Sequence, residues 1–427
     1  MNKINAVIKK LFGNDYFFSV FAKVFGVGIG LVLSVVSSRF FGAELKGVDA
    51  VIMSYVSIYS VFLGMGIYQA YPFYRKREPD IMPQYLNNIS TMFLGYEFIG
   101  IVIACVLLKL GTADYLAIAM IVMPVEVYIK QLNYIVLIEY PRRRNIASII
   151  ISTTEIIVIA LFWLFSSASF MTVVVNIFIV EFLNLFISFY NLKVNPLKIR
   201  LDGSRLWEFA KFGFIPMLVY LCMTINYRVD IQMLKWFDNV TYSDIGVYSL
   251  GIGLAQKIWM IPDAVKDILL SKLIKGKGEN EVAKVLRINI TISVLATFIL
   301  IAVGQPVINW IYGYEYKNAY FIMVLMLVGV IGMIFYKMIY SYNISKGKRI
   351  INLIFLAAAA VLNIIGNCFL IPILNIYGAA IVSVASYNIC GVCFLVYFRK
   401  VSGISYRNLL WIKKEDVEIV KGLFAKK

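Results

Sequence analysis

Residues 350–398 read IINLIFLAAAAVLNIIGNCFLIPILNIYGAAIVSVASYNICGVCFLVYF and contain no Asp, Glu, Lys or Arg. An apolar run of roughly 20 residues is enough to cross a bilayer as a helix, and this run is twice that long. The pattern therefore predicts two membrane-spanning helices, at 350–373 and 376–398, joined by a connection of two residues.

The composition extends this interpretation to the whole chain. Of its 427 residues 61% are hydrophobic and 15% are charged, whereas soluble domains are about half apolar and a quarter charged. The surplus of apolar side chains must face lipid. Ten further runs predict spans at 17–40, 48–71, 86–109, 114–138, 145–165, 170–191, 206–236, 243–271, 286–311 and 319–344. We expect an all-α membrane protein with twelve transmembrane helices.

The chain has 41 Lys and Arg residues against 24 Asp and Glu residues, and the basic residues lie mostly in alternate connections. The basic clusters lie at 75–77, 142–144, 193–205, 272–287 and 346–349, and the remaining connections hold little more than Lys46 and Lys317. Basic connections remain on the cytoplasmic side, so both termini are expected in the cytoplasm. There the excess charge would meet anionic lipid headgroups rather than nucleic acid.

Each half of the predicted bundle opens on the same tripeptide, Phe21-Ala22-Lys23 and Phe209-Ala210-Lys211. Halves of six spans share one orientation, so a pseudo-two-fold axis would run along the membrane normal. Chance similarity among apolar segments is the alternative. The predicted parts are an interfacial amphipathic segment 1–16, an N-lobe 17–191, a cytoplasmic linker 192–205, a C-lobe 206–398 and a basic tail 399–427. The tail would lie in the membrane interface or against the protein.

Several classes of site are disfavoured because the residues they need are missing from the sequence or lie inside an expected span. The chain has no His and no Gly-x-x-x-x-Gly-Lys-Ser/Thr motif, which removes the commonest general base and the phosphate loop of a nucleotide-driven pump. Cys390 and Cys393 lie one helical turn apart inside an expected span, where packing is the simpler interpretation. We therefore expect no catalytic residues, no metal and no bound cofactor apart from a coupling ion, H⁺ or Na⁺.

Basic residues inside expected spans point to an anionic cargo. A charge at mid-membrane costs about 2.5–3.5 kcal/mol, so it needs a partner or water. Lys257 has no carboxylate one turn away, and Arg228 lies two residues from Asp230, a spacing at which the two side chains face apart. Lys23 and Lys337 lie nearer the cytoplasmic face, where they would line the mouth of a cavity or extend to the interface. Arg and Lys match phosphate or pyrophosphate.

Acidic residues inside spans are candidates for ion coupling, and the sequence favours Glu97, Glu155 and Asp230. Other intramembrane charges have a structural explanation. Glu126 and Lys130 are four residues apart and can neutralise each other on one helix, and Asp263 can pair with Lys266. Glu181 is a further acid within a span to which we assign no role.

Short motifs give the chain a resemblance to a known family. They are RFFGAELKG (39–47), YRVD (227–230), GVYS (246–249), IYGYEY (311–316), LNI (362–364), LIP (370–372) and GAA (378–380). Each is weak, but their order and spacing resemble those of the polysaccharide transporter family, the Wzx-type O-antigen and capsule flippases. This family belongs to the multidrug/oligosaccharidyl-lipid/polysaccharide (MOP) exporter superfamily, and the resemblance covers essentially the whole chain.

The resemblance implies twelve spans in two six-helix lobes, as in the related MATE transporters. It also implies outward transport of undecaprenyl-pyrophosphate-linked oligosaccharides across the bacterial plasma membrane by alternating access. Expected partners are this lipid-linked substrate, membrane lipids and polysaccharide assembly enzymes. The family has no strict site motif, so the roles of Lys257, Arg228, Lys23 and Lys337 with the headgroup rest on the interpretation of the helices.

Two other functions remain open. An ion-coupled exporter of drugs or small cations within the same superfamily would favour an acidic cavity, which the isolated Lys257 and Arg228 oppose. A membrane glycosyltransferase or polymerase would carry a large extracytoplasmic loop, whereas each expected outer connection has about ten residues or fewer. The flippase is therefore the leading hypothesis, and the chain is not expected to be an enzyme.

Overall fold

A computed structural model describes residues 15–111, 114–192 and 200–416, and their side chains except those of 15–21, 23, 24 and 267. All regular structure in these ranges is helical, with no strand. The expected interfacial segment 1–16 lies almost entirely outside the described residues. Eight described helices are long and apolar enough to cross a membrane, or nine when one bent pair counts as a single span.

The chain divides into two compact units, residues 1–217 (unit 1) and 218–427 (unit 2). Unit 1 holds α2 (Asp15–Leu63), α3 (Ile67–Arg77), α4 (Ile81–Leu110), α5 (Asp114–Glu139), α6 (Pro141–Phe165), α7 (Phe170–Leu192) and the first part of α8 (Gly203–Lys235). Unit 2 holds the rest of α8, α9 (Tyr242–Ile274), α10 (Glu279–Val307), η1 (Ile308–Tyr312), η2 (Tyr314–Tyr316), α11 (Ala319–Val328), α12 (Val330–Ser345), α13 (Arg349–Ser402) and α14 (Tyr406–Leu410).

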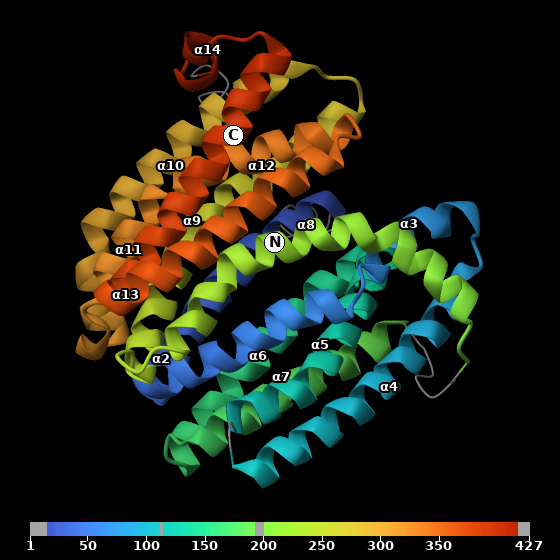
Figure 1. Cartoon of the computed structure of the whole chain (residues 1–427), viewed down its shortest axis with the longest axis vertical. Helices are drawn as coiled ribbons and strands as arrows, with labels where there is room; N and C mark the ends of the chain where they lie inside the picture. The colour runs from blue at the N-terminus through green and yellow to red at the C-terminus, as the bar shows by residue number, and fades with distance from the viewer. Residues whose placement is uncertain (1–14, 112–113, 193–199, 417–427) are drawn as a thin grey trace, which may run out of the picture. The chain divides into compact units, whose positions relative to one another are not determined.

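One helix lies at the centre of each unit (Figure 1). In unit 1, α5 packs against α2, α4, α6 and α7. In unit 2, α12 packs against α9, α10 and α13. Charged residues on a central helix are shielded from lipid and must find their partners among its neighbours.

Non-helical residues divide the two longest helices. Gly42 in α2 has φ 69° and ψ 175°, and Asn375 in α13 has φ 51° and ψ −132°. Both lie in expected connections, at 41–47 and 374–375. A bend of 46° separates α11 from α12 inside the span expected at 319–344. The 33-residue α9 is not among the apolar candidates, because residues such as Gln256 and Lys257 dilute its hydrophobicity.

The span expected at 48–71 is interrupted at Gly64–Gly66, which corrects the prediction of one continuous helix. Gly66 has φ 66°, a left-handed conformation that glycine adopts readily. It lies against Gly213 of α8, and a Cβ added to either glycine would overlap the backbone of the other. The two segments can approach this closely only because neither residue has a side chain, and the sequence pattern does not reveal that contact.

We expect Gly213→Ala to lower the free energy of unfolding of the chain by about 1–3 kcal/mol, because the methyl group forces two backbones apart. Gly95→Ala is the matched control, since Gly95 is also helical and has open space where the Cβ would lie. Denaturant unfolding of both purified variants measures the difference. Equal unfolding midpoints for the two variants would contradict the proposed close packing.

The tail after α13 lies against unit 2, so the described part takes the second of its two expected positions. Leu409 of α14 is fully buried. Arg287 of α10 donates from Nε to Oδ2 of Asp416 at 2.5 Å and from Nη2 to Oδ1 at 2.9 Å. A third hydrogen bond, from Nη1 of Arg287, reaches the carbonyl of Asn408 at 2.7 Å. Both charged side chains are more than nine-tenths buried.

We expect Asp416→Asn to destabilise the chain by about 3–5 kcal/mol at neutral pH, because it leaves the buried Arg287 unpaired. Hydrogen bonds from Arg287 hold the pKa of the Asp416 carboxyl below its ordinary value of 3.8. The contribution is therefore present above about pH 4 and is lost as the pH falls through the lowered pKa. Thermal unfolding at pH 7 and in acid, with the exposed Glu415→Gln as control, tests this. A pH-independent difference would contradict it.

Candidate functional site

Asp230 of α8 is fully buried in unit 2 and is held by three donors. Its Oδ2 accepts hydrogen bonds from the Tyr248 hydroxyl at 2.5 Å and from Ser383 Oγ at 3.1 Å. Its Oδ1 accepts one from the backbone N–H of Ile231 at 2.8 Å. Arg228 forms no ion pair with it, as the spacing of two residues predicted. Asp230 is thus a buried carboxylate served by neutral groups.

A chain of amides continues from Ser383 into α13. Asn363 donates to Ser383 Oγ at 3.2 Å, and Asn367 donates to Asn363 Oδ1 at 2.7 Å. Both asparagines are fully buried, and the Oδ1 atom of Asn367 has no partner among the described residues. Carboxylate, hydroxyl and amide oxygens together suit a proton or a hard cation. No cluster of three or more His, Cys, Asp or Glu in the described ranges is arranged to hold a metal ion.

The two cations singled out in the sequence, Lys257 on α9 and Arg228 on α8, both belong to unit 2. Each is partly buried. Neither makes a hydrogen bond or a salt bridge to another described residue. Arg228 lies within electrostatic range of Asp230, but the hydrogen-bond donors of both cations remain available to an oppositely charged ligand.

Lys337 of α12 has a buried side chain, so of its two expected positions it does not take the one that extends to the interface. Its Nζ donates to Asp263 Oδ2 at 2.7 Å and to the carbonyl of Trp259 at 3.3 Å. Asp263 also pairs with Lys266 at 3.7 Å, as expected from their spacing. The three side chains carry one net positive charge, and Lys337 can meet an anion only if it shares or leaves Asp263.

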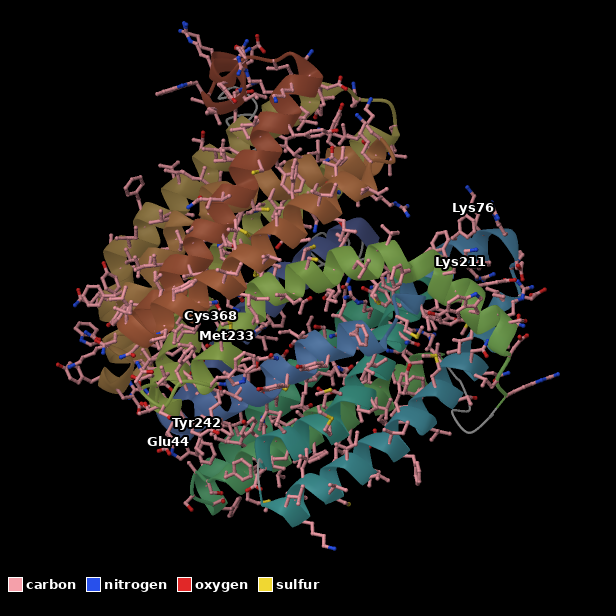
Figure 2. The ribbon with its side chains drawn as sticks, in the orientation of Figure 1. Glu44, Lys76, Lys211, Met233, Tyr242 and Cys368 are labelled. Atoms are coloured by element: carbon pink, nitrogen blue, oxygen red, sulfur yellow. The ribbon has the colours of Figure 1, made fainter. Side chains whose placement is uncertain are left out.

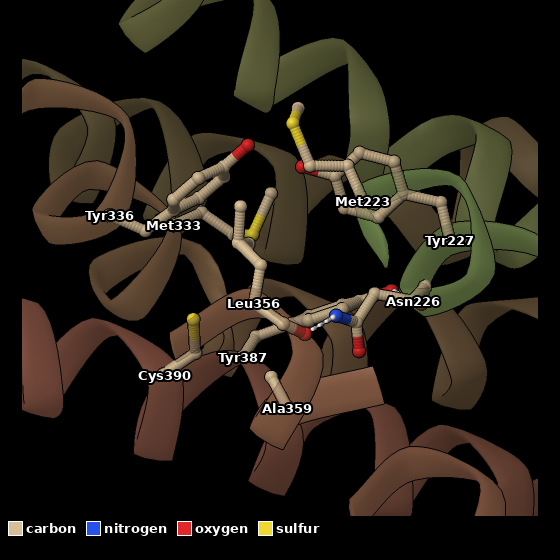
Figure 3. A pocket seen from close by; sticks show the side chains of 9 residues that line it. All are labelled: Met223, Asn226, Tyr227, Met333, Tyr336, Leu356, Ala359, Tyr387 and Cys390. Atoms are coloured by element: carbon tan, nitrogen blue, oxygen red, sulfur yellow. Dashed lines mark hydrogen bonds between the residues drawn. The ribbon is translucent and has the colours of Figure 1, made fainter. Parts of the chain in front are cut away.

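A small pocket lies beside this cluster (Figure 3). Its lining is mostly apolar and aromatic: Met223, Asn226, Tyr227, Met333, Tyr336, Leu356, Ala359, Tyr387 and Cys390. Asn226 closes one side by donating to the carbonyl of Leu356 at 3.3 Å. The rings of Tyr227 and Tyr387 both contact Trp259, which connects the pocket to Lys337.

Unit 1 holds the other predicted residues apart from one another. The side chain of Lys23 lies outside the described side chains. Glu97 of α4 has a buried Oε2 with no hydrogen-bond partner in the described residues. Glu155 of α6 accepts a hydrogen bond from Asn176 of α7 at 3.4 Å. Neither acid contacts the other.

Sequence reasoning gave no role to Glu181 of α7, whose side chain is 7% exposed. Its Oε2 is buried without a hydrogen-bond partner in the described part of the chain. The signal that could have found it is the absence of any basic residue on α7 within one turn of Glu181. The Glu126–Lys130 pair, expected from its spacing, is confirmed at 3.1 Å.

The exposed ends of unit 1 agree with the expected charge distribution (Figure 2). Lys76 of α3 and Lys211 of α8, both expected near the cytoplasmic face, lie toward the same end of the unit. Glu44, in a connection expected outside, lies toward the opposite end.

No family model and no curated protein matches the chain. Among solved structures it is similar to the lipid II flippase MurJ in an inward closed conformation, with a TM-score of 0.73 and 16% identity over 97% of this chain and 94% of that one. For an inward-facing multidrug resistance MATE family transporter of the MOP superfamily, the TM-score is 0.65 and the identity 14%, over 88% of this chain and 94% of that one. For a MOP superfamily transporter from Pyrococcus furiosus, the TM-score is 0.59 and the identity 12%, over 93% of this chain and 98% of that one.

These neighbours are transporters rather than enzymes, and identities this low show the fold alone. Together with the apolar helices, they indicate a multi-pass membrane protein. The fold of the chain is that of the MOP superfamily transporters.

Proposed function

We propose that the chain is a flippase that moves undecaprenyl-pyrophosphate-linked oligosaccharides outward across the bacterial plasma membrane, for capsule, O-antigen or exopolysaccharide assembly. The observation that carries the proposal is that Lys257 and Arg228, both partly buried, form no hydrogen bond or salt bridge with another described residue. Arg228 lies within electrostatic range of Asp230 without pairing with it directly. In a membrane fold shared with a lipid II flippase, such cations suit the phosphates of a lipid-linked sugar.

In this mechanism the pyrophosphate leaves cytoplasmic water for a cavity where Lys257 and Arg228 replace its hydration shell. Arg228 can bind it in a bidentate manner, and Lys257 acts as a point charge. Lys23 and Lys337 would contact the headgroup nearer the cytoplasm, with Lys337 exchanging the carboxylate of Asp263 for a phosphate oxygen. The polyprenyl tail would stay in lipid throughout, because moving it through a polar cavity would cost its full hydrophobic transfer energy.

Alternating access would require two lobes of six spans each. The interruptions at Gly42 and Asn375, with the bend between α11 and α12, support twelve crossings. An even number in each half gives both lobes the same orientation and leaves both termini in the cytoplasm. The cytoplasmic connections would then be the basic ones, next to anionic lipid and the polysaccharide assembly enzymes.

Coupling to H⁺ or Na⁺ is proposed at Asp230, with Glu97 and Glu155 as further candidates. Asp230 lies among hydroxyl and amide groups from α9 and α13. Binding a cation there changes the charge at a junction of three helices, α8, α9 and α13. Such a change can bias one conformation over another if the two differ in cation affinity.

The second candidate is an exporter of drugs or small cations. The likeness to MATE transporters and the aromatic pocket beside Trp259 favour it, because aromatic rings bind organic cations. The unpaired Lys257 and Arg228 oppose it. A glycosyltransferase or polymerase is less favoured, since the neighbours are transporters.

Deletion of the gene in its source organism separates these functions. A flippase deletion should accumulate undecaprenyl-linked repeat units on the inner leaflet, detected by protection of their sugars from an external glycan-modifying enzyme in intact spheroplasts. Drug susceptibility should stay unchanged. Normal surface polysaccharide with increased dye accumulation in the deletion strain would favour the second candidate instead.

A further inference from the structure

A cluster of polar residues in unit 1 lies where the central helix α5 packs against α6 and α7. Glu126 and Lys130 lie on α5, Glu155 on α6, and Glu181 with Asn176 on α7. Glu181 lies within electrostatic range of Glu126, Lys130 and Glu155. These residues lie on three consecutive helices, and the packing of α5 against α6 and α7 brings them together.

The cluster has fewer donors than its acceptors need. Lys130 Nζ binds Glu126 at 3.1 Å and donates to Ser60 Oγ at 2.8 Å. The amide N–H of Asn176 reaches Glu155 at the long distance of 3.4 Å. Glu181 Oε2 and Asn176 Oδ1 are buried acceptors with no donor among the described residues, and both side chains are only 7% exposed. A buried acceptor without a donor is costly, and a carboxylate more so.

The region also has fewer basic side chains than its carboxylates would need for pairing. On α2, which also packs against α5 and α7, Lys46 pairs with Asp49 at 2.9 Å. Lys130 pairs with Glu126. Lys46 and Lys130 are thus each engaged by another carboxylate. Lys46 also lies within electrostatic range of Glu155, but neither Glu155 nor Glu181 forms a salt bridge with a described residue. An ionised carboxylate in this setting would lie unpaired in a low-dielectric interior.

We propose that Glu181 is a proton-binding site, which holds a proton on its carboxyl group while Lys130 is engaged by Glu126. Protonation removes the unpaired charge of the buried carboxylate. When the O–H bond breaks, the proton passes to water and Lys130 shifts from Glu126 to Glu181. The inference rests on the proposed function only for its use in driving transport.

Infrared difference spectroscopy of the purified full-length chain in lipid nanodiscs, without substrate, tests the site. At neutral pH the wild type should show the C=O band of a protonated carboxyl group. Glu181→Gln should lose the amplitude of one such group. Glu208→Gln, which removes an exposed carboxylate from α8, is the matched control and should keep the band. An unchanged band in Glu181→Gln would overturn the proposal.

Two further variants test the role of Lys130. Glu126→Gln leaves Lys130 without its carboxylate, so Lys130 should pair with Glu181 and the band should vanish at neutral pH. Lys130→Met should keep the band to higher pH than in the wild type. Loss of the band on adding Na⁺ at constant pH would overturn the proposal in favour of a sodium site. None of these measurements involves cargo, so a failure of the flippase assignment would leave them unaffected.

Discussion

Lys257→Ala and Arg228→Ala should each reduce export of surface polysaccharide about 10- to 150-fold, because each removes charge-assisted hydrogen bonds to phosphate worth about 1.5–3 kcal/mol. Neither side chain has a hydrogen bond or salt bridge to another described residue to lose, so truncation should leave the fold intact. Quantitative staining of surface polysaccharide in a complemented deletion strain measures the effect. The double variant should abolish export.

The matched control is Lys211→Ala, which removes an exposed lysine from the same helix that carries Arg228. It should export normally. Arg228→Lys keeps the charge but loses the bidentate geometry, so it should fall between the wild type and Arg228→Ala. Each variant is first shown to be folded at the membrane in normal amount. Normal export by Lys257→Ala and Arg228→Ala would remove both residues from the mechanism.

Asp230→Asn should abolish transport driven by an ion gradient while leaving cargo binding unchanged. The amide keeps the shape of the carboxylate, and it can still accept hydrogen bonds from Tyr248 and Ser383. It cannot change charge, so it can no longer favour one conformation when a cation binds. Transport in proteoliposomes under an imposed H⁺ or Na⁺ gradient measures the loss.

The control for this prediction is Asp238→Asn, an exposed acid just beyond the end of α8. It should respond to the gradient as the wild type does. Gradient-driven transport by Asp230→Asn at the wild-type rate would show that coupling lies elsewhere, with Glu97 and Glu155 as the next residues to replace.

The helical segments could be predicted from the sequence, because hydrophobic run length is a local property. The helices α5, α7 and α9 begin and end within three residues of the predicted bounds. The interruption at Gly64–Gly66 could not be predicted, since it depends on contact with Gly213, far away in the chain. Residues 50–71 of the expected span contain no proline or charge that would mark the interruption.

The contacts of the polar residues could likewise be predicted only where both partners lie on one helix. Glu126 with Lys130, and Asp263 with Lys266, pair within one helix, so their spacing predicts the contact. Lys337 was expected to line the mouth of a cavity or to extend to the interface, and the sequence did not reveal its contact with Asp263 on another helix. Asp230 was recognised as a candidate from its position, although its partner Ser383 lies 153 residues away. Contacts between helices decide which intramembrane charges are free, and a single sequence does not contain them.

The most direct test of the account uses purified protein in proteoliposomes with two fluorescent cargoes that share one polyprenyl chain and one sugar. In the first cargo a pyrophosphate links the two parts, and in the second the linkage is uncharged. The proposed mechanism predicts that the wild type translocates the pyrophosphate-linked cargo alone, that Lys257→Ala and Arg228→Ala each translocate it about 10- to 150-fold more slowly, and that the double variant moves neither cargo. Equal translocation of both cargoes, or of the charged cargo by both variants, would contradict recognition of phosphate by these cations.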